Sequence, residues 1–247
     1  MKRTPILLLL PLTLALAATG LAQQQRDTPP PPVLVVNGNA QVQATPDEAT
    51  VRLGVVRQET TAQAAQEQAN RAAQAILAEI TKLGIPASGI QTSRLTLTPV
   101  YAPQPRSDSR DAPKIVAYSA SNQVAVELSN LTQIGPVIDG GLRAGANNVE
   151  GVQFRLKNDL PVREQALKQA VAEARQKAET IAAALGVRLA GVQEVLEGGV
   201  SINEPTLGFA SAALTMELRQ ATPTPVSPGQ IEVHASITVK YLIAAGR

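Results

Sequence analysis

The chain has 247 residues, no cysteine and one histidine, and aromatic residues make up 2% of it. Its 22 Lys and Arg residues nearly balance its 20 Asp and Glu residues. This composition excludes disulfides and thiol chemistry, and it offers neither the excess positive charge nor the aromatic platforms on which nucleic-acid binding usually depends. Stability must come mainly from the burial of aliphatic side chains.

Residues 1–22 have the three parts of a secretory signal peptide. Lys2-Arg3 forms a basic start, an apolar stretch runs from Ile6 to Ala18, and Gly20-Leu21-Ala22 supplies the small residues that a signal peptidase reads. We expect cleavage after Ala22, with an uncleaved anchor as the alternative. The remaining chain is close to neutral and is expected to be periplasmic or secreted, with no stable membrane span.

The next segments predict a linker and two strands. Residues 23–32 end in prolines and predict an extended linker, and residues 33–247 are expected to form the folded domain. A first strand is predicted over 33–44, in which Asn37-Gly38-Asn39 is interpreted as a bulge or bend. A turn at Thr45-Pro46-Asp47 and the alternation that follows predict a second, half-buried strand. We expect these two strands to pair as a hairpin.

Two long helices are predicted, over residues 61–83 and 161–185. Each has apolar side chains at three- and four-residue steps, each ends at Leu-Gly followed by Ile or Val, and each precedes a predicted strand. Their alanines would let both helices lie close to a sheet. The expected buried stripes are Ala65, Ala69, Ala72, Ile76, Ile80 and Leu83 in the first helix, and Leu167, Ala170, Val171, Ala174, Ala178, Ile181 and Leu185 in the second.

The remaining pattern predicts an α+β fold. A short helix is expected over 131–142, and strands are expected over 90–100, 115–128, 149–156, 189–196 and 231–243. In the first of these strands we expect Ile90, Thr92, Leu95 and Leu97 to be candidates for burial. Residues 198–229 are rich in proline, lack a sustained period and predict an irregular insertion. We therefore expect two related halves, with antiparallel sheets and the two Ala-rich helices packed on one face.

Chemistry-bearing residues are few, and each has a structural interpretation. His234 alternates with the apolar positions of the last strand and is expected to be an exposed residue, since a metal site or a triad needs partners that the chain does not offer. Asp47 is expected to bond backbone amides at its turn. Gly145-Ala146-Asn147-Asn148 suits left-handed backbone angles, with a small polar niche beside Asp139 as the alternative. We predict no catalytic residues, no metal site and no cofactor.

Short motifs follow one another in a characteristic order along residues 33–243. They include Val36-Asn37-Gly38-Asn39-Ala40, Thr45-Pro46-Asp47-Glu48-Ala49, Leu83-Gly84-Ile85, Ile90-Gln91-Thr92, Ala120-Ser121-Asn122, Gly145-Ala146-Asn147 and Leu185-Gly186-Val187. Their order and spacing together resemble the SIMPL-domain family of bacterial envelope proteins. The resemblance implies a periplasmic or secreted domain that self-associates, is linked to oxidative-stress tolerance or surface antigenicity, and has no agreed catalytic residues.

The leading hypothesis is a non-enzymatic exported protein that self-associates and supports envelope integrity or oxidative-stress tolerance. Because the chain has no thiol, direct scavenging by cysteine is excluded. The alternative is a binding module that takes a peptide or an envelope protein on a strand edge near 33–44 or 231–243, and a hydrolase is disfavoured. Deletion of residues 201–226 is expected to leave a folded domain of lower oligomeric state. The expected oligomer contacts are Leu207, Phe209, Leu214, Met216 and Leu218.

Overall fold

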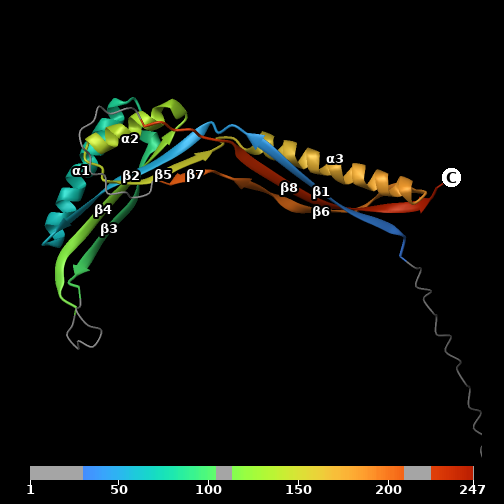
Figure 1. The fold of residues 1–247 in the computed structure, drawn as a ribbon, viewed down its shortest axis with the longest axis horizontal. Coiled ribbons are helices and arrows are strands. Elements are labelled where there is room, and N and C mark those ends of the chain that lie inside the picture. Colours follow the sequence, from blue (N-terminus) through green and yellow to red (C-terminus); the bar gives the residue numbers. More distant parts are fainter. Residues whose placement is uncertain (1–29, 104–112, 209–223, 247) are drawn as a thin grey trace, which may run out of the picture.

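The fold is α+β, with two antiparallel sheets joined end to end in an elongated, bent molecule (Figure 1). The structure, a computed structural model, describes residues 30–103, 113–208 and 224–246. Its elements are β1 (Val33–Ala44), β2 (Glu48–Glu59), α1 (Ala62–Lys82), β3 (Ile90–Tyr101), β4 (Ile115–Leu128), α2 (Ile134–Arg143), β5 (Asn148–Arg155), α3 (Leu160–Ala184), β6 (Val187–Asn203), β7 (Thr206–Gly208) and β8 (Ile231–Ala245). No helix within these ranges is long and apolar enough to cross a membrane.

The two sheets define two modules. The α1 module holds the sheet with strand order β3-β4-β2-β5-β7 together with α1 and α2, and the α3 module holds the sheet β1-β8-β6 together with α3. The expected hairpin between β1 and β2 is wrong. β1 pairs instead with β8 in unbroken register from Val33 opposite Leu242 to Ala44 opposite Ile231, and β2 pairs with β4 and β5. The turn after β1 carries the chain into the other module rather than back along the same strand.

The two modules share one topology. In the α1 module a strand, a helix and a strand pair follow as β2-α1-β3-β4, and the last strand lies in the middle of the order β3-β4-β2. In the α3 module the corresponding elements are β1-α3-β6-β8, and the order β6-β8-β1 is equivalent. The expectation of two related parts agrees with this topology, but the parts are not successive halves. The α1 module, apart from β7, is inserted between the first strand and the helix of the α3 module, and β7 follows between β6 and β8.

α1 begins and packs largely as its sequence predicts. The Thr61 hydroxyl accepts a hydrogen bond of 3.2 Å from the Ala64 amide and so caps the first turn. The buried stripe consists of Ala65, Ala69, Ala73, Ile76 and Ile80, whereas the expected Ala72 and Leu83 lie at its margin and are partly buried. Beneath the helix, the fully buried side chains include Phe154 and Leu53, so this module has a core of large aliphatic and aromatic groups.

α3 packs differently from its prediction. Its buried residues are alanines at strict four-residue steps, and the expected Val171, Ile181 and Leu185 are exposed instead. The reason is a close approach between the helix and the sheet. A Cβ atom on Gly38 would lie 2.0 Å from the carbonyl oxygen of Ala170, so neither β1 nor α3 has room for larger side chains there. Gly38 is therefore a close-contact position in a continuous strand, and the expected bulge or bend at this site is wrong.

Two further expectations about strands need correction. β3 is almost entirely exposed, including Leu95 and Leu97, because it is an edge strand that lies beyond the strands α1 covers. β6 continues to Asn203, so the first residues of the expected insertion at 198–229 belong to a regular strand. β7 then pairs with β5 through Gly151–Gln153, which ties the start of the remaining insertion to the α1 module.

Candidate functional site

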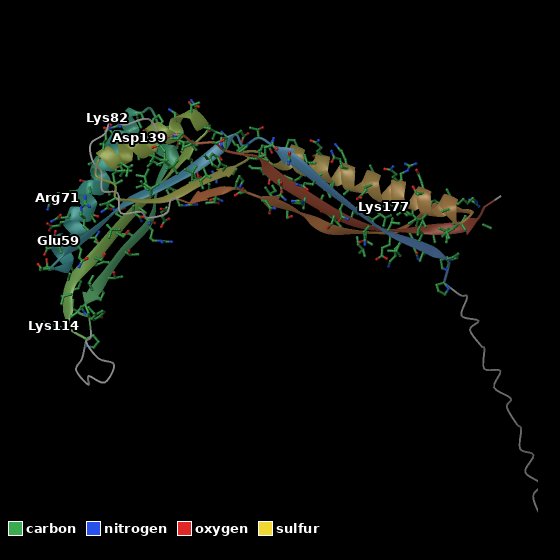
Figure 2. The ribbon with its side chains drawn as sticks, viewed as in Figure 1. Glu59, Arg71, Lys82, Lys114, Asp139 and Lys177 are labelled. Carbon is green, nitrogen blue, oxygen red and sulfur yellow. The ribbon has the colours of Figure 1, made fainter. Side chains whose placement is uncertain are left out.

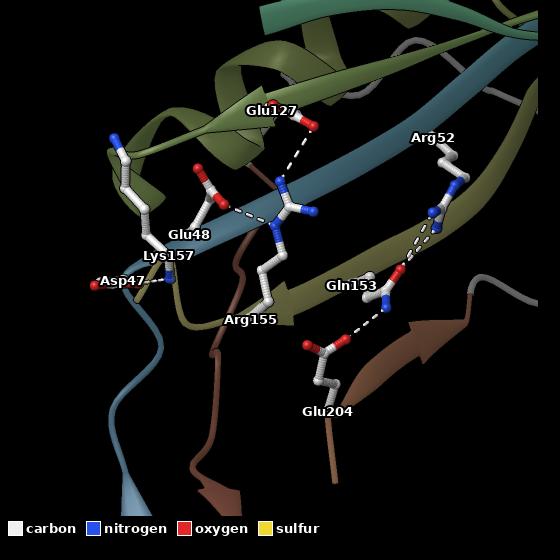
Figure 3. Close-up of polar contacts among 8 residues, drawn as sticks. All are labelled: Asp47, Glu48, Arg52, Glu127, Gln153, Arg155, Lys157 and Glu204. Carbon is white, nitrogen blue, oxygen red and sulfur yellow. Dashed lines mark hydrogen bonds and ion pairs between the residues drawn. The ribbon is translucent and has the colours of Figure 1, made fainter. Parts of the chain in front are cut away.

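A group of polar contacts lies where the two modules meet (Figure 3). The chain passes between the modules at residues 45–47, at 156–159, at 204–205 and again before β8. Each of the first three crossings carries or adjoins a charged side chain that bonds to another segment. This junction is therefore a candidate functional site.

Arg155 is the centre of the junction. It is the last residue of β5, and its Nε donates to Glu48 Oε2 at 2.7 Å while an Nη atom lies 3.1 Å from Glu127 Oε1. Burial acts to lower the pKa of the Arg155 guanidinium, but the bonds to Glu48 and Glu127 outweigh it and raise that pKa above its ordinary value. Glu48 is only 8% exposed, and the charge of its carboxylate is compensated by the permanently charged Arg155. The three side chains together join the ends of β2, β4 and β5.

The Asp47 side chain accepts a hydrogen bond from a backbone amide, as its sequence context predicts. Its Oδ1 accepts from the Lys157 amide at 2.7 Å, and its own amide donates to the Arg155 carbonyl at 3.3 Å. The bonded amide lies in a distant crossing segment rather than in the Asp47 turn itself. The adjacent carboxylates of Asp47 and Glu48 therefore serve different partners, which is not the arrangement of a general acid–base pair.

A second chain of bonds reaches the crossing between β6 and β7. Both terminal nitrogens of Arg52 lie 3.2 Å from Gln153 Oε1, and Gln153 Nε2 donates to Glu204 Oε2 at 2.7 Å. Figure 3 shows this chain on the neighbouring strands, apart from the Arg155 cluster. Every polar group named here has a structural partner, and these bonds hold the ends of β2, β4 and β5 to one another and to the crossing segments beside them.

His234 lies where the sequence places it, on the face of β8 that points away from α3. Its side chain is 40% exposed, and its Nε2 lies 3.5 Å from Glu232 Oε2. It borders a shallow recess of about 330 Å³ together with Asn39, Ser201 and Ser236. Among the residues that the structure describes, no three His, Cys, Asp or Glu side chains lie together as metal ligands would.

The turn before β5 confirms only part of its interpretation. Gly145 has a φ of 104°, as expected for a left-handed position. Asn147 instead bridges to β2, where its side chain accepts from the Val56 amide at 2.8 Å and donates to the Val56 carbonyl at 3.0 Å. Asp139, labelled in Figure 2, does not form the alternative niche with this turn but accepts from the Thr224 hydroxyl at 2.6 Å.

Of the expected oligomer contacts, only Leu207 lies within the described residues. It belongs to β7 and is exposed. Phe209, Leu214, Met216 and Leu218 lie outside the described residues, so their role stays a prediction. The segment that contains them begins at β7, beside β5, and ends at Thr224, beside α2, so both of its ends lie on the α1 module.

Sequence reasoning missed a groove on the α3 module. It has a volume of about 710 Å³ and lies between α3 and the outer strand β6. Its apolar lining includes Val171 and Leu189 as well as Val192, Ala182 and Tyr241. One feature of the sequence could have indicated this groove. The alanines of α3 repeat at strict four-residue steps, and Val171 falls outside that repeat, so it cannot lie on their buried face.

The architecture defines a class of protein: a two-module α+β domain with a β-α-β-β unit in each module and a polar junction between them. The SIMPL family model, described as a protein of unknown function (DUF541), matches residues 34–241, and the chain belongs to this family. This confirms the resemblance derived from the motifs.

The chain is similar to several bacterial proteins along most of its length. It is 31% identical over 216 residues to the 26 kDa periplasmic immunogenic protein of Brucella melitensis biotype 1, which covers 85% of this chain and 84% of that protein. It is 30% identical over 168 residues to the uncharacterized protein YggE of Escherichia coli K12, with 66% and 64% covered. The YggE protein of Edwardsiella ictaluri is 28% identical over 162 residues, with 66% of each chain covered.

Proposed function

We propose that this protein is a non-enzymatic component of the periplasm that self-associates and so supports envelope integrity or oxidative-stress tolerance. The observation that carries the proposal is the row of uncovered aliphatic side chains on the outer strands of both sheets. These include Leu95 and Leu97 on β3 and Val192 and Val195 on β6, all of them exposed, and Leu196 is exposed on the other face of β6. Exposed apolar rows on edge strands are typical of surfaces that another chain covers.

The cellular location is supported from two directions. Residues 1–22 have the sequence pattern of a signal peptide, and the Brucella relative is named as a periplasmic protein. We expect the exported protein to begin at Gln23. N-terminal sequencing of the protein from a periplasmic fraction tests this, and an intact Met1 there would show that the apolar stretch is retained as an anchor.

A protective role would have to be indirect. The chain has no cysteine and two methionines, so it offers little chemistry for the direct consumption of oxidants. The junction residues support the same interpretation, since Arg155, Glu48 and Asp47 are all engaged in structural bonds at the end of the α1 module. Protection would then follow from assembly or from a partner in the envelope.

A binding module for a peptide or an envelope protein is the second candidate. The open edge strands favour it, because an extended peptide can add to an unpaired sheet edge through backbone hydrogen bonds. The edge expected near 231–243 is wrong, since β8 lies between β1 and β6 and is paired on both sides. The two candidates differ in the occupant of the edge, which is a second copy in one case and a different chain in the other.

The mass of the purified mature chain tests the proposal. Light scattering over about a hundredfold range of concentration should give a mass that is a multiple of the single chain, because a specific interface persists on dilution above its dissociation constant. A monomer throughout this range would overturn self-association and leave the binding module. Deletion of residues 209–223 should lower the mass.

The deletion needs narrower limits than the sequence suggested. Removal of 201–226 would shorten β6, remove β7 and break the contacts of Thr224 and Val226 with the α1 module. Removal of 209–223 deletes none of the residues that make these described contacts. Circular dichroism of the shorter deletion should match the intact protein, which separates a loss of assembly from a loss of folding.

A further inference from the structure

We propose that residues 210–218 of one copy add as a strand to the outer edge of β6 in a second copy and cover the groove between β6 and α3. This inference rests on the proposed self-association and names the two surfaces that meet. Four features of the molecule support this contact: an uncovered apolar surface, an edge with no capping side chains, a segment of matching pattern, and a limit on how far that segment can reach.

The apolar face of the α3 sheet continues beyond its helix. Val192 and Val195 of β6 stand opposite Tyr241 and Val239 of β8, and both β8 residues are buried. Yet Val192 is 55% exposed and Val195 is 53% exposed, because α3 lies mainly over β1 and β8. Val171 on the near side of the helix is exposed as well, so the core of this module is open along one flank.

The opposite flank of the same helix is closed by polar bonds. The Asn39 amide of β1 donates to the Glu173 carboxylate, and the Asn37 carbonyl accepts from Lys177 Nζ at 3.1 Å. Figure 2 shows Lys177 on the helix beside β1. On the β6 side, no side chain in the described part of the chain bonds to the backbone between Val187 and Gly199. The β1 edge is thus blocked against a further strand at Asn37 and Asn39, whereas the β6 edge, although its register shifts at three points, carries no such bond.

The segment after β7 has the pattern of the missing strand. Leu214, Met216 and Leu218 alternate with Thr215, Glu217 and Arg219, which is the period of a strand with one apolar face. Added to β6, such a strand would place its apolar face beside Val192 and Val195 and its polar face toward solvent. Burial of three large apolar side chains would stabilise the contact.

The segment cannot reach this groove within its own chain. Both of its ends are held on the α1 module, at Gly208 beside β5 and at Thr224 beside α2. A loop of roughly 15 residues that leaves and returns can extend at most about 29 Å from its ends. From Asn203, at the junction end of β6, to Val192 the strand spans about 36 Å. A second copy must therefore supply the strand, and the contact joins different surfaces on the two copies.

Cysteine cross-linking tests the contact directly, because the natural chain has no cysteine. Purified Val192→Cys and Met216→Cys proteins are mixed at equal concentration and oxidised. We expect a disulfide-linked dimer that contains one copy of each variant, since only residues whose Cα atoms approach within about 7 Å can be bridged. The matched control replaces Val192→Cys with Val35→Cys, an exposed valine on the opposite edge of the same sheet. The control mixture should give at least about fivefold less of the mixed dimer.

The other outcomes are equally decisive. Equal cross-linking by Val35→Cys, or none by Val192→Cys, overturns the inference. A monomeric, internally bridged product from the double variant V192C/M216C would also overturn it, because the segment would then reach its own groove. Light scattering of the same samples distinguishes failure of this contact from failure of self-association. An oligomer without the mixed disulfide means that the chain self-associates through another surface. A monomer overturns both the contact and self-association.

Discussion

The two modules have the same β-α-β-β plan, but they are packed by opposite means. The α1 module encloses large side chains such as Phe154 and Leu53, and it adds α2 and β5 around them. The α3 module brings a line of alanines against β1 at Gly38 and has no second helix among the residues that the structure describes. The two modules show that one topology can be stabilised either by a core of large side chains or by a close approach of helix and sheet on small ones.

The choice of packing has a consequence for the surface. A helix that lies close to a sheet on small side chains covers a narrow band, so the outer strand β6 keeps Val192 and Val195 in solvent. In the α1 module, α2 packs on β2 and β5 pairs with it, and the uncovered strand is β3 at the far edge of the sheet. The open flank of the α3 module is therefore the direct result of its alanine stripe.

Truncation of a large side chain should destabilise the α1 module more than the α3 module. Phe154 is fully buried, and truncation to Ala should lower the free energy of unfolding by about 3–5 kcal/mol, because a cavity replaces the ring. Urea denaturation followed by circular dichroism measures this. Val195→Ala is the control on the exposed flank of the other module and should cost about 0.5 kcal/mol or less. Similar losses for the two variants would contradict the comparison.

Addition of bulk should affect the α3 module most. Gly38→Ala would place a Cβ atom 2.0 Å from the Ala170 carbonyl oxygen and 2.8 Å from the Ala174 Cβ. We expect a loss of about 1–3 kcal/mol in unfolding free energy, because the helix must move away from β1. Gly191→Ala, where a Cβ atom meets nothing within 4 Å, is the matched control for adding a methyl group to a strand glycine. Equal unfolding midpoints would show that close approach is not limiting.

The helices could be predicted from the sequence because their signals are local. Thr61 caps α1, and glycines with positive φ follow both long helices at Gly84 and Gly186. The pairing of β1 could not be predicted in the same way. Thr45-Pro46-Asp47 has the residues of a turn whether the chain reverses on one strand or passes to another sheet, and the true partner, β8, lies at the far end of the chain.

Alternation predicts which side chains share a face but not whether anything covers that face. Leu95 and Leu97 alternate as a buried strand would, yet they extend past the edge of α1 and stay in solvent. The junction shows the same limit. The sequence predicts that Asp47 bonds a backbone amide, but its partner Lys157 is distant in the chain, and the pairing of Glu48 with Arg155 has no local signal.

The polar closure of the β1 flank should depend on pH. The hydrogen bond from the Asn39 amide, and then Lys177, lower the pKa of Glu173 below its ordinary value of 4.5. A lowered folded-state pKa contributes stability above the ordinary value and loses it as pH falls through the folded value. The wild type should therefore be more stable than Glu173→Gln near neutral pH, and the difference should vanish in acid below the folded-state pKa.

Chemical denaturation at a series of pH values from about 3 to 7 measures this difference. Glu164→Gln lies on the same helix and pairs with Lys168 rather than with β1, so it serves as the matched control. A difference that grows as pH falls would contradict the assignment. So would an equal effect of Glu164→Gln.

The smallest effect is expected on the open face of the α3 sheet, at His234. This face points away from the helix, and the imidazole is 40% exposed with Glu232 as its charged neighbour at 3.5 Å. Exposed pairs of this kind contribute little, so His234→Ala should change the unfolding free energy by about 0.5 kcal/mol or less. It should leave the assembly mass unchanged, because the groove beside β6 opens on the helix side.

Thermal unfolding, light scattering and metal analysis of the His234→Ala variant check each part. A larger loss of stability, a smaller assembly or the loss of a bound metal would place function on this face and remove the contrast between the closed and open sides of the module.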